Sequence, residues 1–306
     1  MMRIPDRMLL LTAAATLLLG AAHAPPAAAQ DWRDIDVPRD PLPGHDWVLD
    51  WSVSDSFNYS DKSDWRFTRR WREGKPDGWL GPGATFFKAG NSFLVGGKLT
   101  IFGSRVPEAR RGAPRNDHGF FTDRNTHTAY ITSKKQLRPP LYTEVRMKAS
   151  STPLSSNFWL LSDDNETEID VVEIYGDTDW FRRHPAHNAH FFKRGGNGDI
   201  NRQGHHTTDR RWDNQYHRYG VFWQNDRYCE IFYDGDLVRQ MWLPGQIPDP
   251  TGQYLNRSMR LIFDLEAHTW RKQAGVPSDA DLADWGRNNM QVDWVRTYRS
   301  VGRRGR

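Results

Sequence analysis

Three carboxylates stand close together in one strand-like hexapeptide, Glu168-Ile169-Asp170-Val171-Val172-Glu173. Side chains of a regular strand alternate between its two faces, so Glu168 and Asp170 share a face while Glu173 points to the other. One extra residue in a β-bulge at Val171-Val172 would return Glu173 to the first face. The pattern therefore predicts three carboxylates on one face, with Ile169 and one of the two valines in the core.

Carboxylates grouped in this way suit the hydrolysis of a glycosidic bond with retention of configuration. One carboxylate attacks the anomeric carbon and a protonated one releases the leaving oxygen, the two lying about 5–5.5 Å apart. We expect Glu168 to be the nucleophile and Glu173 the acid/base. Asp170 would hydrogen-bond its neighbours and keep their protonation states distinct. The alternatives are an acidic solvent face on a strand, or carboxylates gathered for a metal.

The elements around this hexapeptide are predicted to be strands. Two-residue alternation dominates after residue 90, and segments with the period of a helix are hard to find. Asp234-Gly235 is a type I′ hairpin signal, and one short helix is expected near Ser278–Trp285. Many strands with no βαβ rhythm predict an all-β antiparallel sandwich. The clearest strands are expected at Tyr142–Ala149, at Val221–Val238 (two strands, with a turn at Gln224–Arg227), at Met259–Leu265 and at Met290–Tyr298.

The beginning of the chain has the pattern of an export signal. Arg3 and Arg7 precede an apolar run over Met8–Ala22, and small residues follow as far as Ala29. The apolar run is shorter than the roughly 20 residues that cross a membrane, and no second hydrophobic stretch follows. We expect a signal peptide over residues 1–29 and a mature protein that is secreted or periplasmic, with no membrane association.

The composition indicates a sugar-binding domain more than a nucleic-acid-binding one. The formal net charge of +4 is too small to imply nucleic acid by itself. Fourteen tryptophans are spread over Trp32–Trp294, and aromatic planes of this abundance often stack on sugar rings. Cys229 is the single cysteine of the chain, so no disulfide can form within it. One catalytic domain is expected over residues 30–300, followed by a basic tail, residues 301–306.

The hexapeptide resembles the bulged catalytic signature of glycoside hydrolase family 16, in the form found in β-agarases and β-porphyranases. Further segments match β-agarases in their usual order, and together they cover nearly all of the chain after the signal peptide. The likeness weakens at Ala129-Tyr130, near which these enzymes commonly have a glycine. The matching segments are Gln30–Trp32, Val53–Tyr59, Gly78–Gly83, Ile131–Lys134, Asn157–Trp159, Tyr216–Gly220 and Val292–Arg296.

The resemblance implies a β-jelly-roll sandwich of two antiparallel sheets, with an open concave cleft for the substrate. It implies the same three roles for the carboxylates and adds residues that touch the sugar. Trp159 matches the aromatic floor beside the cleaved sugar, and Trp79 a more distant stacking platform. His190, Glu266 and Arg271 are expected to bind the substrate. Core packing is the alternative for each tryptophan.

The resemblance also implies a structural calcium site away from the catalytic residues, formed by Asp31, the backbone of Ser56 and Asp293. Oxygen ligands from separated segments suit calcium. The alternative is an Asp31 that is disordered and an Asp293 that is merely solvated. No catalytic cofactor is expected.

The patterns predict a secreted, retaining glycoside hydrolase, and the resemblance implies that it is endo-acting on β-1,4 linkages of agar-type galactans, first of all agarose. A monomer is expected. Five arginines precede the Ile131–Lys134 segment, and arginine binds sulfate esters well. Porphyran, carrageenan or another sulfated galactan is therefore an alternative substrate, unless this loop is only a solvated surface. A noncatalytic galactan-binding protein is the third interpretation. The arginines are Arg105, Arg110, Arg111, Arg115 and Arg124.

Overall fold

The computed structural model describes residues 31–303 except 118–119, 177, 193–197, 214, 250 and 270–275. The expected signal peptide, residues 1–29, lies outside the described residues, as do residues 304–306 of the expected tail. The described residues before Asp36 belong to a separate unit, which contains the short 3-10 helix η1 (Trp32–Asp34). The second unit begins at Asp36.

Two large antiparallel sheets make up this unit, each with eight strands. We name them sheet A and sheet B. Sheet A contains, in spatial order, β19 (Asp236–Trp242), β18 (Tyr228–Tyr233), β17 (Tyr216–Asn225), β11 (Leu141–Lys148), β21 (Met290–Gly302), β5 (Lys98–Ile101) and β4 (Ser92–Val95), and β1 (His45–Leu49) pairs with β21. Sheet B contains β15 (Asp199–Asn201), β14 (Ala186–Phe192), β13 (Thr167–Tyr175), β12 (Ser155–Ser162), β20 (Met259–Glu266), β10 (Tyr130–Ser133) and β2 (Trp71–Glu73), and β16 (Gly204–His205) pairs with β14.

Smaller elements connect and flank the two sheets. The small strands are β3 (Thr85–Phe87), β9 (Thr126–Thr128) and β6 (Ser104–Arg105) in one sheet, with β7 (Arg115–Asp117) and β8 (Phe120–Thr122) in another. The helices are α1 (Trp65–Arg70), α2 (Leu243–Gln246) and α3 (Asp279–Ala283), and the 3-10 turns are η2 (Ala89–Asn91), η3 (Glu108–Arg110) and η4 (Phe181–Arg183). No helix in the described part of the chain is both long and apolar enough to cross a membrane.

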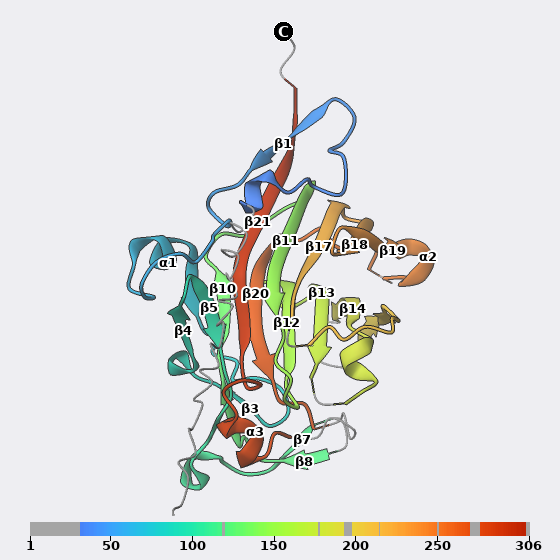
Figure 1. The fold of residues 1–306 in the computed structure, drawn as a ribbon. Helices are drawn as coiled ribbons and strands as arrows, with labels where there is room; N and C mark the ends of the chain where they lie inside the picture. The colour runs from blue at the N-terminus through green and yellow to red at the C-terminus, as the bar shows by residue number, and fades with distance from the viewer. Residues whose placement is uncertain are drawn as a thin grey trace, which may run out of the picture. The chain divides into compact units, whose positions relative to one another are not determined.

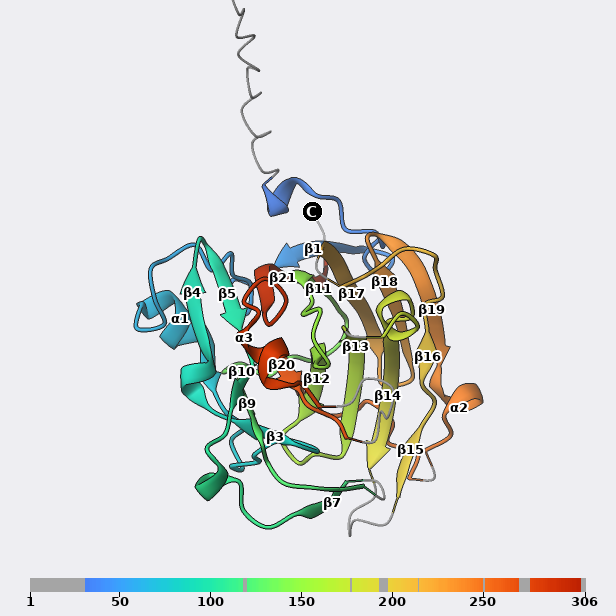
Figure 2. The same ribbon diagram turned by 60° about the horizontal axis from the view of Figure 1, so that its bottom comes forward.

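The core fills the space between the two sheets, which lie as two layers in Figures 1 and 2. Val145 and Val295 of sheet A and Phe158, Ile169 and Phe263 of sheet B belong to one buried cluster. Their neighbours along each strand point to the outer faces, as the two-residue period requires. The predicted sandwich of two antiparallel sheets is confirmed, and the outer face of sheet B is where the site residues gather.

Most of the predicted elements are present, and two helices were missed. The expected strands correspond to β11, β17, β18, β20 and β21. Asp234 and Gly235 both have positive φ, at 52° and 95°, as a type I′ hairpin requires. The expected helix is α3, capped by Ser278. The sequence did not predict α1 and α2, because each spans at most six residues and too few turns to display a helical period.

Candidate active site

The hexapeptide Glu168–Glu173 lies in β13, and the predicted bulge interrupts it. On the β12 side, Phe158 faces Val172 and the next residue, Trp159, faces Asp170, so that Val171 is left without a partner. The pairing with β14 shifts at the same place. The bulge is therefore confirmed. Both valines are fully buried, which corrects the expectation of one valine in the core, because the extra residue turns inward beside its neighbour.

The bulge is supported from the opposite sheet. The carbonyl of Val171 accepts a hydrogen bond of 3.0 Å from the hydroxyl of Tyr233, a fully buried side chain of β18. A buried carbonyl that leaves the strand ladder needs such a partner. At the end of β13, a Cβ on Gly176 would lie 2.2 Å from the carbonyl oxygen of Ser150, so only glycine allows this approach.

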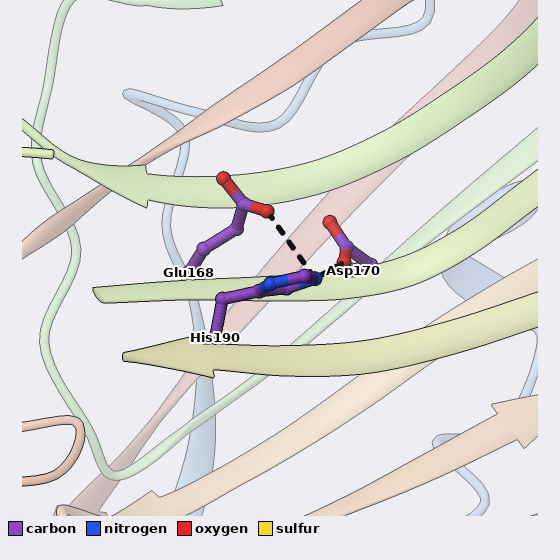
Figure 3. A group of neighbouring side chains, drawn as sticks. All are labelled: Glu168, Asp170 and His190. Atoms are coloured by element: carbon purple, nitrogen blue, oxygen red, sulfur yellow. Dashed lines mark ion pairs between the residues drawn. The ribbon is translucent and has the colours of Figure 1, made fainter. Parts of the chain in front are cut away.

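The three carboxylates of β13 have different partners. Glu173 accepts hydrogen bonds from the Tyr175 hydroxyl at 3.1 Å and from the amide nitrogen of Gln203 at 3.3 Å. Glu168 and Asp170 instead face His190 of β14, whose Nε2 lies 3.8 Å from Glu168 Oε1 and 3.0 Å from Asp170 Oδ2. Figure 3 shows this ring between the two carboxylates. The outer face of sheet B thus holds all three acids near one another.

Burial dominates the electrostatics of this face. Burial, with Asp170 adding to it, raises the pKa of Glu168 well above its usual range, and the charge of His190 acts in the opposite direction. For His190 itself, burial would lower the pKa, but hydrogen bonds to Asp170 and Asp199 outweigh this effect and raise the pKa well above its ordinary value. The acids around His190 thus favour its protonated form.

A metal is the other occupant that this cluster could take. Ligand atoms of Glu168, Asp170 and His190 all lie within 4.8 Å of one another. A protonated imidazole cannot bind a metal, however, and the carboxylates that raise the pKa of His190 favour the proton. A metal at this cluster would therefore compete with a proton for His190.

Glu266 belongs to a second acidic group beside the first. It lies on β20 with its side chain buried, and it accepts hydrogen bonds from Asn157 at 3.1 Å and from the ring of His268 at 2.8 Å. Burial, together with the charges of Glu173 and Asp170, raises the pKa of Glu266 to about 8. Glu266 thus lies in the site, as expected, and tends to hold a proton.

Asp264 lies two residues before Glu266, on the same face. Its carboxylate accepts hydrogen bonds from Asn157 at 2.9 Å and from the indole nitrogen of Trp159 at 3.3 Å. It is fully buried, and burial and the charge of Glu266 raise its pKa well above the usual value. Asp264 therefore holds the indole of Trp159 in its orientation.

The two expected stacking residues lie on one aromatic patch of sheet B. Trp159 is only 7% exposed and packs edge to face on Tyr130, with ring centroids 5.9 Å apart. Trp79 packs against Tyr130 and Phe87, and the ammonium of Lys75 lies 5.0 Å from the centre of its ring. Lys75 and Tyr130 also line a small pocket on this face. Trp79 is the more exposed of the two platforms, and Arg271 lies outside the described residues.

The residues of the expected calcium site are engaged with cations. The carboxylate of Asp31 pairs with Arg33, which lowers the pKa of Asp31 to about 2. Asp293 pairs with Arg146 and lies 3.9 Å from Lys98. The backbone bridge between Asp55 and Val295 joins the segments that carry Ser56 and Asp293. The donor atoms are the oxygens that calcium prefers, but a metal ion would have to displace the arginines.

The arginines proposed for sulfate binding mostly support the loop itself. Arg105 pairs with Asp279 at 2.7 Å. Arg111 donates to the carbonyl of Val106, and Arg124 donates to the carbonyls of Gly81 and Thr85. Arg110 is exposed, and the side chain of Arg115 lies outside the described part of the chain. Among the four of these side chains that the structure describes, Arg110 is therefore the one whose exposure fits ligand binding best.

Sequence reasoning missed several residues of the site. Asn157 and Asp264 could have been found, because each lies two residues from a predicted site residue in the same strand and so on the same face. Asp199, Gln203 and His268 gave no such signal, since they come from short strands and loops whose position depends on the pairing of β14 and β20 with their neighbours.

The arrangement can perform acid/base and nucleophilic chemistry on a neutral polymer. It combines a bulged strand that brings three acids to one face, aromatic rings beside them and one imidazolium. A buried carboxyl that holds a proton can act as an acid, while one beside a cation can act as an anion. Retaining glycoside hydrolysis requires one carboxyl group that gives a proton and one carboxylate that attacks.

Comparison with known proteins agrees with this geometry. Residues 47–300 match the family described as "Beta-porphyranase A-D, GH16 domain". The chain is 35% identical to an extracellular agarase of Streptomyces coelicolor, over 93% of this chain and 94% of that protein. It is also 35% identical to a β-agarase of Agarivorans albus, over 90% of this chain, but it spans only 62% of that relative's length.

Solved structures give the same result. β-agarase A of Zobellia galactanivorans is similar with a TM-score of 0.78 and 30% identity, over 90% of this chain and 100% of that one. A structure of β-agarase A in complex with oligoagarose matches with a TM-score of 0.78 and 31% identity, over 89% of this chain and 100% of that one.

Proposed function

The chain belongs to glycoside hydrolase family 16, and on that premise we propose that it is an endo-acting, retaining hydrolase of β-1,4 linkages in agar-type galactans, with agarose as its first substrate. The observation that carries the proposal is the bulge at Val171, which brings Glu168, Asp170 and Glu173 to one face. The names of the relatives as agarases support the choice of substrate.

In this reaction Glu168 attacks the anomeric carbon while Glu173 gives its proton to the leaving oxygen, so that the glycosidic bond breaks and a covalent glycosyl-enzyme forms. Glu173, now ionised, takes a proton from water, and the resulting hydroxide displaces Glu168. Two inversions restore the β configuration. Trp159 and Trp79 offer ring faces to the sugars, and Glu266 and His190 lie within the same face to bind hydroxyl groups. Arg271 is proposed for the same role.

The test is a panel of galactans incubated with the purified protein, with reducing ends measured over time. Agarose is expected to be cut internally, with a rapid fall in viscosity, and early products are expected to keep the β anomer by proton NMR. Absence of reducing ends from every galactan would refute the hydrolase, and would favour a binding protein. An α anomer formed first would refute the retaining mechanism.

A sulfated galactan is the second candidate substrate, and the name of the matching family, which is that of porphyranases, favours it. Arg110, exposed in η3, is the residue with which to test it. Arg110→Ala should then weaken cleavage of porphyran more than cleavage of agarose, with Arg69→Ala, an exposed arginine of α1, as a matched control. Equal rates for the variant and the parent on both polymers would show that Arg110 does not bind the substrate.

We also propose that the protein is exported after removal of residues 1–29, works as a monomer, and holds a structural calcium ion at Asp31, Ser56 and Asp293. The relative from S. coelicolor is named extracellular, which supports export. N-terminal sequencing of the protein from the medium and sedimentation analysis test the first two proposals. A calcium ion would have to replace arginine at both carboxylates, so its contribution to stability should be modest.

A further inference from the structure

One aspartate outside the predicted set contacts the active site from the edge of sheet B. We propose that Asp199 is a positioning residue that holds His190 as a cation between Glu168 and Asp170, and thereby keeps the nucleophile ionised. The inference rests on the proposed function. In this proposal His190 stabilises the ionised nucleophile in addition to contacting sugar hydroxyls. Asp199 acts only through His190.

The geometry fixes the ring of His190 on every side. Both carboxylate oxygens of Asp199, on β15, contact Nδ1 of the ring, at 2.8 and 2.9 Å. The opposite nitrogen, Nε2, points to Asp170 at 3.0 Å. Phe192 stacks on the ring with an interplanar angle of 10° and centroids 5.3 Å apart. Asn201 donates to the second oxygen of Asp199 at 2.6 Å and so holds Asp199 in turn.

The charges around the ring all favour its protonated form. Glu168 and Asp170 face it from β13, and Asp199 faces it from β15. Nδ1 faces the carboxylate of Asp199, and Nε2 faces Asp170 at 3.0 Å and the side-chain amide nitrogen of Asn188 at 2.8 Å. The imidazolium is the form of the ring that donates to both carboxylates. The side chains of His190, Glu168 and Asp170 are at most 17% exposed, so solvent screens their attractions weakly, whereas Asp199 is 37% exposed and acts through direct contact with Nδ1.

The nucleophile needs this cation. Glu168 must be anionic to attack, yet its burial and the neighbouring acids Asp170, Glu173 and Glu266 all raise its pKa. Among the ion pairs of the described residues, none joins a lysine or arginine to Glu168. The charge of His190, with its Nε2 at 3.8 Å from Oε1, is the attraction that offsets burial. Without Asp199, two carboxylates instead of three would hold the proton on His190.

The experiment is Asp199→Asn, which keeps an oxygen that can accept from Nδ1 and removes only the charge. The acid limb of kcat/KM on agarose should move to higher pH by about one unit, since a nearby opposite charge shifts a carboxyl pKa by roughly 1–3 units. The loss should lie in kcat more than in KM. Long-range proton–nitrogen NMR should show His190 titrating at lower pH than in the parent. Asp46→Asn, which removes an exposed charge on β1, should change neither profile.

A double-mutant cycle separates this task from a merely structural one. His190→Gln by itself should move the acid limb of kcat/KM to higher pH. Adding Asp199→Asn to His190→Gln should move it little further, because the effect of Asp199 passes through the ring of His190. An unmoved acid limb in a folded Asp199→Asn protein, or an equal loss with and without His190, would overturn the inference. If the parent cuts no galactan, the proposed function is wrong. The titration of His190 by NMR then still tests whether Asp199 stabilises the protonated ring.

Discussion

The outer faces of the two sheets carry buried acids in opposite ways. On sheet A, Glu144 of β11 lies against Arg296 of β21 at 2.7 Å, and both side chains are at most 1% exposed. On sheet B, Glu168, Asp264 and Glu266 are buried with histidine or amide partners, and burial raises the pKa of each. Buried acids are thus paired with arginine on one face, whereas on the other face they have raised pKa values and histidine or amide partners.

The difference shows how the fold separates stability from chemistry. A buried acid that is paired with arginine stays ionised and holds strands together, but it has no proton to give and no freedom to attack. A buried acid without such a partner costs stability, and in return its protonation state can change during a reaction. The predictions below test whether the two faces divide in this way.

The largest effect is expected on activity, from the acids of β13. Glu168→Gln should abolish formation of the glycosyl-enzyme, even on a substrate with an activated aryl leaving group. Glu173→Gln should lower the rate on agarose by about 10²–10⁴-fold, because general acid catalysis is lost. On the aryl substrate it should still form the intermediate and then stall. Trapping of the intermediate by mass spectrometry distinguishes the two variants.

Asp170→Asn should give an intermediate loss with a shifted pH profile, because the neighbouring acids and His190 lose a charge to which they are coupled. All three variants should unfold at temperatures close to that of the parent, since none removes an arginine pair. A variant that loses activity only in proportion to its loss of folded protein would contradict the division between the two faces.

The largest loss of stability is expected on sheet A. Arg296→Met leaves Glu144 buried without its main partner and should lower the free energy of unfolding by about 3–5 kcal/mol. The activity of each folded molecule should stay the same. Denaturant unfolding measures the loss, and Glu144→Leu added to Arg296→Met should recover much of it. Arg303→Ala, which breaks an exposed contact with Asp46, is the control and should cost about 1 kcal/mol or less.

A smaller effect with a defined pH dependence is expected at Glu266. Its pKa is about 8 in the folded protein and near 4.5 in the unfolded chain, so between these values the folded state binds more protons. Stability from this group is therefore fully present below about pH 4.5 and is lost as the pH rises to about 8. Glu266→Gln removes this loss. The melting temperature of this variant minus that of the parent should increase between pH 5 and pH 8. A difference that stays constant over this range would contradict the assignment.

The smallest effect is expected from removal of metal. Excess chelator should lower the melting temperature slightly if calcium bridges Asp31, Ser56 and Asp293, and Asp293→Asn should abolish that response. The rate on agarose at room temperature should not change. An unchanged melting curve together with no metal by elemental analysis would leave Arg146 and Lys98 as the permanent partners of Asp293.

Local pattern was sufficient to predict the center of the site. The odd spacing of Glu168, Asp170 and Glu173 predicts the bulge, because only one inserted residue reconciles it with the period of a strand. Alternation predicts β11, β20 and β21 closely, and Asp234-Gly235 predicts the hairpin between β18 and β19. Each of these features depends on residues close together in the sequence, and for that reason the sequence predicts it.

Contacts across the sheets could not be predicted in the same way. The carbonyl of Val171 depends on Tyr233, and Asn157 reaches Asp264, through pairings between segments far apart in the sequence. Trp159 is only 7% exposed because β10 and β20 place Tyr130 and Ile262 beside it. The register of distant strands decides such contacts, and it leaves no trace in a single strand's pattern.

The amino-acid sequence by itself determined the all-β sandwich, the bulged strand and the identity of the three acids, because side-chain period and turn chemistry are local properties. Only the tertiary structure decided which acid meets a cation. Glu144 meets Arg296 and Glu168 meets His190 because antiparallel pairing brings β11 to β21 and β13 to β14. The protonation of a buried acid follows from those neighbours and from exclusion of water, and both exist only once the sheets have packed.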